Sequence, residues 1–341
     1  MWYNMRQKKE MLSFAAMFEQ GEKVKRRREF GKALKWCVLV LGAAVSSSIA
    51  CADGVVHKSA PMRFLSFNVW GDYFKNPVNE REAAIESTIR KYSPDVVALQ
   101  EMTPAWWASP MLGNLSSEYG VVRGDEEDAL KRAGAKGPRK PRWINHEPLL
   151  YRKSRLALLD SGLDFFHLRL GAEKSATWAV LEDKVSAKRF IALATHFWYV
   201  HKGAESDVIR EYNALQIMWR ISEIRNKWGN LPVILGGDVN SVPGSLAHDV
   251  FARNGFATAA DAADVRSEHR SYHLNPERGE DGKWHAKKFP PEEDVAKLSI
   301  DHVFFTVGIH ALKHIIDTDD QTALDATDHW PVAVDFELTG K

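Results

Sequence analysis

The sequence predicts an α/β protein built as one domain, and two observations support this fold class. Short runs of apolar, β-branched or aromatic residues recur from residue 62 onward, and amphipathic helical patterns alternate with them instead of forming a separate block. A chain of 341 residues with 45% hydrophobic content can also bury a substantial core. Strands and helices mixed in this way are typical of a single α/β domain, which we expect to span residues 53–341.

The first predicted unit is a strand, a helix and a second strand. Residues 63–69 alternate apolar and polar side chains, and residues 96–100 form a short apolar run, so we expect both to be strands. Between them, residues 81–92 repeat apolar positions at helical spacing, as residues 206–228 do later in the chain. Another helix is expected to follow Ser245. Further strands are expected at residues 148–151, 177–183, 189–195, 232–236, 300–304 and 331–338.

Two segments with many charged residues, 123–145 and 271–298, are expected to be long loops. Long charged loops in a compact domain are either functional lids or solvated insertions. The sequence leaves both alternatives open for each segment.

The first 52 residues have the order of a secretory signal peptide. A basic stretch precedes an apolar run at residues 36–45, and small residues then lead to the triplet that ends at Ala52. We therefore predict cleavage before Asp53 and export to the periplasm or the medium. Cys51 leaves lipid anchoring open as an alternative. Internal methionines at positions 11 and 17 are alternative starts, and a buried N-terminal helix is the structural alternative.

Removal of this leader changes both the charge and the cysteine content. The leader holds both cysteines, ten of the 46 basic residues and four of the 45 acidic ones, which leaves 36 basic and 41 acidic residues and a net charge of −5. Without thiols, disulfides and cysteine-ligated zinc are excluded. A mildly acidic protein is no generic polyanion binder either, so a partner that carries phosphate needs a local site or a bound cation.

Polar side chains follow several predicted strands directly, where ligands of α/β sheets collect. Taken singly, each is also explained as the first solvated residue after a strand or as part of an ordinary turn. Glycines 236 and 237 permit a close backbone approach before one of these positions. The residues at these strand ends are Asn68, Glu101, His196, Asp238 and Asn240.

Near the C-terminus, Asp301 is the second residue of one predicted strand, and the pair Asp328 and His329 precedes the last one. A carboxylate that hydrogen-bonds an imidazole fixes its tautomer and raises its basicity, which is the usual general-base arrangement. A lone Asp-His pair is more often a surface turn, so only the combination of motifs indicates a site. Carboxylates suit Mg²⁺, which prefers oxygen ligands and can also bind a substrate phosphate.

Together these motifs resemble the endonuclease/exonuclease/phosphatase superfamily, which has the deoxyribonuclease-I-like fold, and its bacterial metal-dependent hydrolase branch in particular. The resemblance covers about residues 62–338 and implies a four-layer sandwich of two packed β-sheets flanked by helices. It also implies hydrolysis of phosphoesters with Mg²⁺ or Mn²⁺. The motifs are Phe67-Asn68-Val69-Trp70, Leu99-Gln100-Glu101, Thr195-His196, Gly237-Asp238-Val239-Asn240, Ile300-Asp301-His302 and Thr327-Asp328-His329-Trp330-Pro331-Val332.

The resemblance implies a role for each matching residue. Glu101 would bind the metal with help from Asn68 and Asp328. His329, paired with Asp301, would be the base, although the motif leaves the division of this role between His329 and Asp238 open. Asp238 and Asn240 would position water and phosphoryl oxygens, His196 would steady the phosphoryl group, Glu147 would orient His196, and Phe197 and Trp198 would line the substrate cleft or pack in the core.

We therefore expect an exported hydrolase that depends on a divalent metal, with a phosphodiesterase as the first expectation. The alternative is an inactive binding protein on the same fold, and intact Glu101, Asp238 and His329 argue against it. A nucleic acid, a phospholipid and a sugar phosphate stay open as substrates, and no obligate protein partner of the expected monomer is evident. Departures from the family pattern are few: Thr327 replaces the commoner serine, and aromatic residues follow His196.

Overall fold

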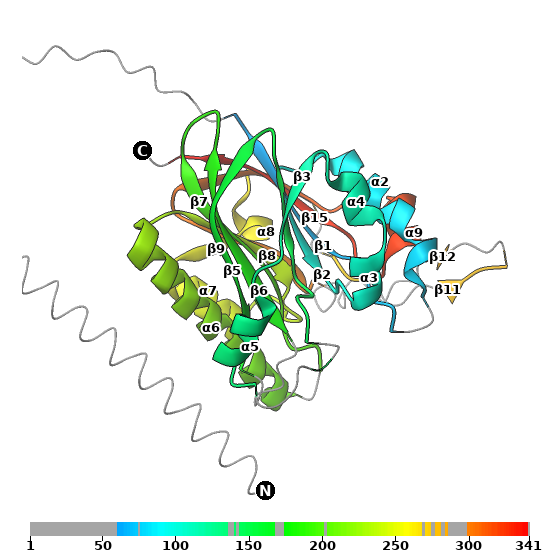
Figure 1. Ribbon diagram of the computed structural model, residues 1–341, viewed down its shortest axis with the longest axis horizontal. Helices are drawn as coiled ribbons and strands as arrows, with labels where there is room; N and C mark the ends of the chain where they lie inside the picture. Colours follow the sequence, from blue (N-terminus) through cyan, green and yellow to red (C-terminus); the bar gives the residue numbers. More distant parts are fainter. Residues whose placement is uncertain are drawn as a thin grey trace, which may run out of the picture. The chain divides into compact units, whose positions relative to one another are not determined.

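Two mixed β-sheets pack face to face, and helices cover their outer faces (Figure 1). This computed structural model describes residues 60–73, 76–135, 140, 143–167, 174–200, 203–267, 270–273, 277–280, 284–285 and 299–339. The α/β class and the four-layer sandwich are thereby confirmed. The predicted leader, residues 1–52, lies outside the described residues, and its boundary with the domain stays a prediction.

The first sheet has seven strands, and its centre is β1 (Met62–Asn68). β1 pairs parallel with β2 and antiparallel with β15, so the ends of β1 and β2 lie at the same edge as the start of β15. The order across the sheet is β10 (Val265–Arg266), β14 (Ile309–Ile315), β15 (Val332–Leu338), β1, β2 (Val96–Gln100), β4 (Leu149–Arg152) and β3 (Tyr119–Val122).

The second sheet has six strands, and its pairing brings three polar residues into one row. His196 at the end of β7 lies opposite Asp238 at the end of β8, which in turn lies opposite Asp301 at the start of β13. The order is β5 (Leu156–Phe165), β6 (Ser175–Asp183), β7 (Arg189–His196), β8 (Val233–Asp238), β13 (Asp301–Thr306) and β9 (Phe256–Thr258).

Apolar side chains from the facing sides of both sheets fill the space between them, with Phe64 and Ile234 among the fully buried ones. The sheets approach closely at Gly236, where an added Cβ would lie 2.4 Å from Cε1 of Phe64. Gly237 is equally restricted, because its Cβ would lie 2.2 Å from the carbonyl oxygen of Thr195. The predicted close approach at the glycine pair is confirmed, and any larger residue would force the strands apart.

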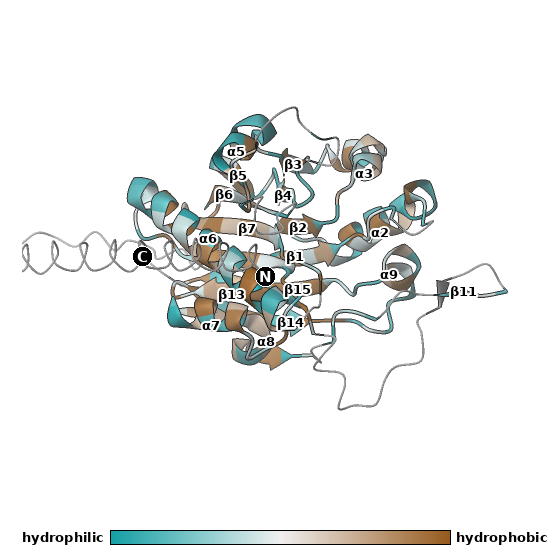
Figure 2. Ribbon diagram, turned by 90° about the horizontal axis from the view of Figure 1, so that it is seen from below, coloured by the Kyte–Doolittle hydropathy of each residue, from teal (hydrophilic) through white to brown (hydrophobic). Residues whose placement is uncertain are grey.

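Helices cover each sheet on the side away from this interface (Figure 2). Ile85 and Ile89 of α2 (Glu82–Tyr92) pack on Leu65 and Phe67, and the apolar residues of α6 (Ala204–Trp228) and α7 (Leu246–Arg253) pack on the six-stranded sheet. Among the described helices, none combines the length and apolarity needed to cross a bilayer. The remaining short elements are η1 (Val78–Glu80), α3 (Pro104–Ala108), α4 (Met111–Leu115), α5 (Glu126–Arg132), α8 (Ala259–Ala262), α9 (Gln321–Ala326), β11 (Glu277–Arg278) and β12 (Trp284–His285).

All predicted strands and helices occur in the structure within a few residues of their expected ends. The prediction of one long loop at 123–145 is wrong, because α5 forms there. The Asp125 carboxylate caps this helix by accepting hydrogen bonds of 3.0 Å from Glu127 N and Asp128 N. Acidic residues fill its first turn and basic residues its last, so the charge run reflects the helix dipole.

The second expected loop, 271–298, is described only in part. Its first residues pack against the predicted site, as detailed below, and β11 pairs antiparallel with β12. Residues 274–276, 281–283 and 286–298 lie outside the described residues, so the choice between a lid and a solvated insertion stays open.

Two buried histidines should make the fold sensitive to acid. The rings of His248 and His302 contact edge to face at 4.4 Å, and burial lowers their pKa values from 6.5 to about 4 and about 3. As the pH falls below 6.5, the unfolded chain takes up protons that the folded chain excludes, so stability present above pH 6.5 is lost toward pH 4.

We expect His248→Phe to reduce the stability difference between pH 7 and pH 5 by about 2 kcal/mol. The measurement is urea unfolding of wild type and variant at both pH values. The control is His310→Gln, since His310 is exposed and its ion pair with Asp264 lies at the surface, so the variant should change the difference by less than about 1 kcal/mol. Equal pH dependence in wild type and His248→Phe would contradict the prediction.

Candidate active site

The two sheets contribute different halves of a polar cluster at one edge of the sandwich. From the six-stranded sheet come the neighbours His196, Asp238 and Asp301. From the seven-stranded sheet come Asn68 at the end of β1, Glu101 after β2, and Asp328 and His329 before β15. Every one of these residues was predicted from the sequence, and the structure brings them together.

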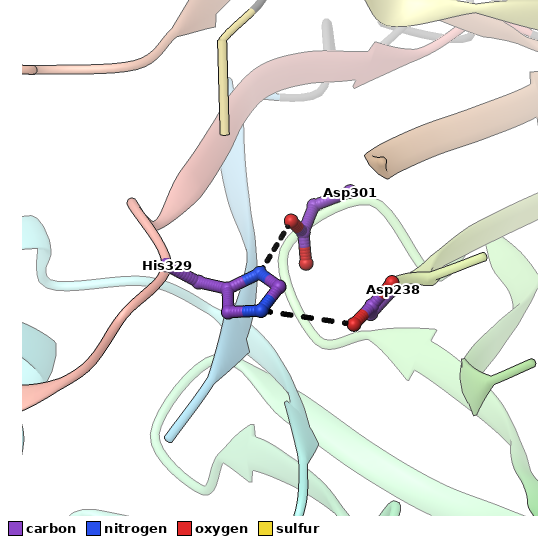
Figure 3. Close-up of side chains that lie close together, drawn as sticks. All are labelled: Asp238, Asp301 and His329. Atoms are coloured by element: carbon purple, nitrogen blue, oxygen red, sulfur yellow. Dashed lines mark hydrogen bonds and ion pairs between the residues drawn. The ribbon is translucent and has the colours of Figure 1, made fainter. Parts of the chain in front are cut away.

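Asp301 and His329 form a hydrogen-bonded pair that joins the two sheets (Figure 3). Asp301 Oδ2 lies 2.7 Å from His329 Nδ1, and both side chains are buried. Ser271 holds the carboxylate, because its hydroxyl donates to Asp301 Oδ2 at 2.7 Å. His329 Nε2 is therefore turned toward Asp238, whose Oδ2 lies 3.8 Å away.

Asp238 occupies the centre of the cluster. Its Oδ2 accepts a hydrogen bond of 3.2 Å from Asn68 Nδ2 and lies 3.3 Å from His196 Nε2. Its Oδ1 accepts one of 2.9 Å from the backbone N–H of Asn240. Burial and the neighbouring Asp301 carboxylate raise the pKa of Asp238 to about 7.

His329 is the main positive group of this cluster. Burial alone would lower its pKa, but the carboxylates of Asp301 and Asp328 outweigh that effect and raise the pKa to about 10. At neutral pH its imidazole is therefore protonated, and both ring nitrogens are donors.

Glu101 faces the cluster from the other side and is the least buried of its carboxylates. Its Oε2 accepts a hydrogen bond of 2.7 Å from the backbone N–H of Gly71, and its Oε1 lies 3.4 Å from Asn68 Nδ2. Glu101 adopts a left-handed backbone with φ 63°, as Trp70 and Asn240 also do with φ 55° and 48°. Such conformations cost about 1–3 kcal/mol each and concentrate at functional sites.

The donor set fits a divalent cation. Three carboxylates, those of Asp238, Asp301 and Asp328, lie within 3.8 Å of the ring nitrogens of the His329 imidazolium. Burial raises the pKa of Asp328 to about 7 as it does for Asp238, because charges are costly to bury. Glu101, Asp328 and the Asn68 amide supply the oxygen ligands that Mg²⁺ and Mn²⁺ prefer.

A second set of possible ligands consists of Asp238, Asp301 and His329, whose donor atoms lie within 4.8 Å of one another. Two of those atoms, Asp301 Oδ2 and His329 Nδ1, already bind each other at 2.7 Å. A cation bound by all three residues would have to displace this hydrogen bond.

His196 lies where it was predicted, but its environment differs from the expectation. Glu147 Oε1 is 4.0 Å from His196 Nδ1, beyond hydrogen-bond distance, and Ser175 donates to the other oxygen of Glu147. Lys174 Nζ instead lies 2.8 Å from Nδ1 and 3.0 Å from Nε2 of His196. Burial and Lys174 hold the pKa of His196 well below its usual value, so its ring is neutral.

Three other predicted positions have different outcomes. Phe197 is fully buried and packs between Phe166 and Phe251, so the prediction that it lines a substrate cleft is wrong and the core-packing alternative holds. Trp198 is partly exposed and contacts the ring of Tyr199 at 5.2 Å. Asn240 lies in the site, although its Nδ2 donates to the carbonyl of Phe197 at 3.3 Å.

Sequence reasoning missed four residues that shape the site. Ser271 and Tyr272 open the segment that was expected to be a loop, and the Tyr272 ring lies 4.8 Å from that of His329. Lys174 precedes β6 without any motif around it, and Arg81 looked like one more polar residue at a helix start. No local sequence signal distinguishes these residues from solvated ones, because their partners are remote in the chain.

Arg81 is buried, with 1% of its surface exposed, beneath the Asn68 and Asp328 side of the site. Its guanidinium donates to four carbonyl oxygens, those of Val69, Trp70, Asn76 and Ala326, at 2.6–3.0 Å. It also lies 5.2 and 5.1 Å from the ring centres of Trp70 and Trp106. Burial lowers its pKa to about 10, so the group stays charged at neutral pH.

The sequence from residue 65 to residue 329, which contains every predicted site residue, matches the model of the endonuclease/exonuclease/phosphatase family. The chain belongs to this family. Endonuclease/exonuclease/phosphatase proteins hydrolyse phosphoesters, and the resemblance stated from the motifs is thereby confirmed.

Solved structures of the family share the fold. An endonuclease/exonuclease/phosphatase from Bacteroides vulgatus is 24% identical, with a TM-score of 0.61 over 82% of this chain and 99% of its own. A mannosyl-6-phosphatase from Bacteroides thetaiotaomicron is 17% identical, with a TM-score of 0.60 over 81% and 99%. TDP2 from D. rerio, complexed with a single-strand DNA product, is 18% identical, with a TM-score of 0.55 over 81% and 99%. No curated protein matches the chain.

In this family member we expect Arg81→Met to lower the free energy of unfolding by about 3–5 kcal/mol, because four buried carbonyls would lose their donor. Arg81→Lys should lower the free energy of unfolding by less, since an ammonium keeps the charge but lacks the planar arrangement of donors. Urea unfolding measures both. Arg90→Met, on the exposed face of the same helix, is the control and should change stability by less than about 1 kcal/mol. A stability of Arg81→Met equal to that of this control would refute the role of Arg81.

Proposed function

We propose that the protein is an exported phosphodiesterase that depends on a divalent metal. This proposal is carried by one observation: the two sheets bring two different sets of polar groups together at one edge of the sandwich. The hydrogen-bonded Asp301 and His329 face Asp238, and Glu101 offers oxygen ligands nearby, since Asn68 Nδ2 lies 3.4 Å from Glu101 Oε1 and 3.2 Å from Asp238 Oδ2. Phosphoester hydrolysis needs both halves, one to activate water and one to offset the charge of the phosphoryl group.

Asp238 is the better base of the two candidates. His329 is protonated at neutral pH and cannot accept a second proton, whereas Asp238 has one oxygen directed toward His196 and His329. In this scheme Asp238 takes a proton from water while the water oxygen bonds to phosphorus. The bond between phosphorus and the leaving oxygen breaks, and the leaving oxygen takes up a proton from solvent. His329 then donates a hydrogen bond to a phosphoryl oxygen from Nε2.

Glu101, Asn68 and Asp328 would hold the cation, which, when bound, supplies a positive charge that withdraws electron density from the phosphoryl group. The carboxylate of Asp301 keeps the His329 ring in one orientation, and Ser271 does the same for Asp301. These residues thus fix the geometry before substrate arrives, which lowers the cost of reorganisation during the reaction.

The relatives support a phosphoester substrate, but they act on chemically different phosphoesters. One of them is a mannosyl-6-phosphatase and another is complexed with single-strand DNA product. A diester is proposed first because the site combines a water-activating carboxylate with donors for phosphoryl oxygens. We propose export because residues 1–52 contain a basic stretch, an apolar run and a triplet of small residues in the order of a signal peptide.

The first test is metal removal. Purified protein that begins at Asp53 is incubated with bis-p-nitrophenyl phosphate, plasmid DNA, RNA, sphingomyelin and sugar phosphates, with Mg²⁺ or Mn²⁺ and with EDTA. We expect turnover of at least one substrate that EDTA abolishes and added metal restores. No metal-dependent turnover on the whole panel would exclude the proposed activity and favour a binding protein.

The second test concerns the base. Asp238→Asn keeps the size of the side chain but cannot take a proton, so kcat should fall about 10²–10⁴-fold. Asp249→Asn, on the exposed side of α7, is the matched control and should keep the wild-type rate. Circular dichroism confirms that both variants fold. Near-normal turnover by Asp238→Asn would remove Asp238 from the role of base.

A further inference from the structure

Lys174 is a charged residue beside the candidate active site that the scheme above does not use. It precedes β6, and its backbone carbonyl accepts a hydrogen bond of 3.0 Å from Phe166 N, which fixes its place at the end of the β5 and β6 ladder. Its side chain is partly buried, and its Nζ lies close to both ring nitrogens of His196.

No carboxylate among the described residues forms an ion pair with the Lys174 ammonium, but its positive charge acts at longer range on buried Glu147 and Asp238 and opposes the rise of their pKa values. Its closest side-chain contacts are the two ring nitrogens of His196, at 2.8 and 3.0 Å, and the Tyr199 ring centre lies 5.6 Å away. Most other basic side chains of this fold form ion pairs, such as Arg155 with Asp183 at 2.6 Å. A lysine carries three donors, so this group retains capacity for an anion.

The position of Lys174 relative to Asp238 indicates which anion Lys174 would bind. His196 Nε2 is 3.3 Å from Asp238 Oδ2, so Lys174 and His196 flank the proposed base on one side. Asn68, one of the predicted cation ligands, contacts the same oxygen, with its Nδ2 3.2 Å away. A phosphoryl group attacked by water at Asp238 would therefore lie close to the Lys174 ammonium.

We propose that Lys174 is a substrate-binding residue that donates to a non-bridging oxygen of the scissile phosphoryl group. The inference rests on the proposed function, since it concerns the same reaction. It extends that function, because no sequence motif assigns a role to Lys174. On substrate arrival the ammonium would exchange the neutral imidazole for an anionic oxygen, which makes a stronger, charge-assisted hydrogen bond.

Tyr199 extends this flank to the surface. It is 59% exposed, and its ring lies beside both Lys174 and Trp198. The organic part of a substrate held by Lys174 would therefore meet an aromatic surface. This favours esters whose alcohol is flat or ring-shaped, such as a nucleoside or a sugar.

The test compares Lys174→Met with Lys174→Arg and with Lys188→Met, whose lysine contacts the carbonyl of Leu338 away from the site. The readouts are kcat/KM for bis-p-nitrophenyl phosphate and competitive inhibition by inorganic phosphate. Lys174→Met should lower kcat/KM and raise the inhibition constant of phosphate, each about 10–100-fold. Lys174→Arg should recover most of both, and Lys188→Met should match wild type.

Phosphate binding by wild type and the three variants, measured by calorimetry in Mg²⁺, separates the two proposals. If wild type turns over no phosphoester yet binds phosphate through Lys174, the proposed function fails, while the anion-binding role of Lys174 stands. If wild type is active and Lys174→Met keeps the wild-type kcat/KM and the wild-type inhibition constant of phosphate, the inference is overturned. A loss of kcat/KM with unchanged phosphate inhibition, or with a lowered melting temperature that Lys174→Arg does not restore, would assign Lys174 a structural role and also overturn it.

Discussion

The buried guanidinium of Arg81 is the interaction on which the arrangement of the site depends. It connects the backbone just after β1 with the backbone at the end of α9, two segments more than 240 residues apart, through hydrogen bonds of 2.6–2.8 Å. Asn68 precedes the first segment, and Asp328 and His329 follow the second. A charge is costly to bury, and here four carbonyls and two indole rings offset that cost, aided by the negative charges of Asp328 and Glu101. The orientation of both segments is thereby tied to one side chain.

The division of the site between two sheets explains why so many groups converge without a long loop. Parallel pairing places the end of β7 beside the end of β8, and antiparallel pairing places the start of β13 beside them. The same logic puts the end of β1 beside the start of β15 in the other sheet. Two hydrogen bonds, Asn68 to Asp238 and Asp301 to His329, then close the gap between the sheets.

Much of the fold and of the site could be predicted from the sequence because the relevant signals are local. A polar residue directly after an apolar strand marks a sheet edge, so Asn68, Glu101 and Asp238 were found without knowledge of pairing. The roles of Arg81 and Lys174 could not be predicted, since their partners are brought close only by tertiary packing. Phe197 shows the reverse error, because an aromatic residue beside a catalytic histidine looks functional whether it points into the cleft or into the core.

Because the sheets approach closely at Gly236, the core also sets the spacing of the site residues. The side chain of Phe64 contacts the position where a β-carbon would stand, two residues before Asp238, so the thickness of the apolar layer sets the distance between the metal-side and base-side groups. A displacement of about 1 Å between reacting groups can cost about 10²-fold in rate. Substitutions among the apolar residues between the sheets should therefore change the reaction rate by changing the distance between these groups. Hydrostatic pressure or heat that loosens this layer should abolish activity well before the chain unfolds.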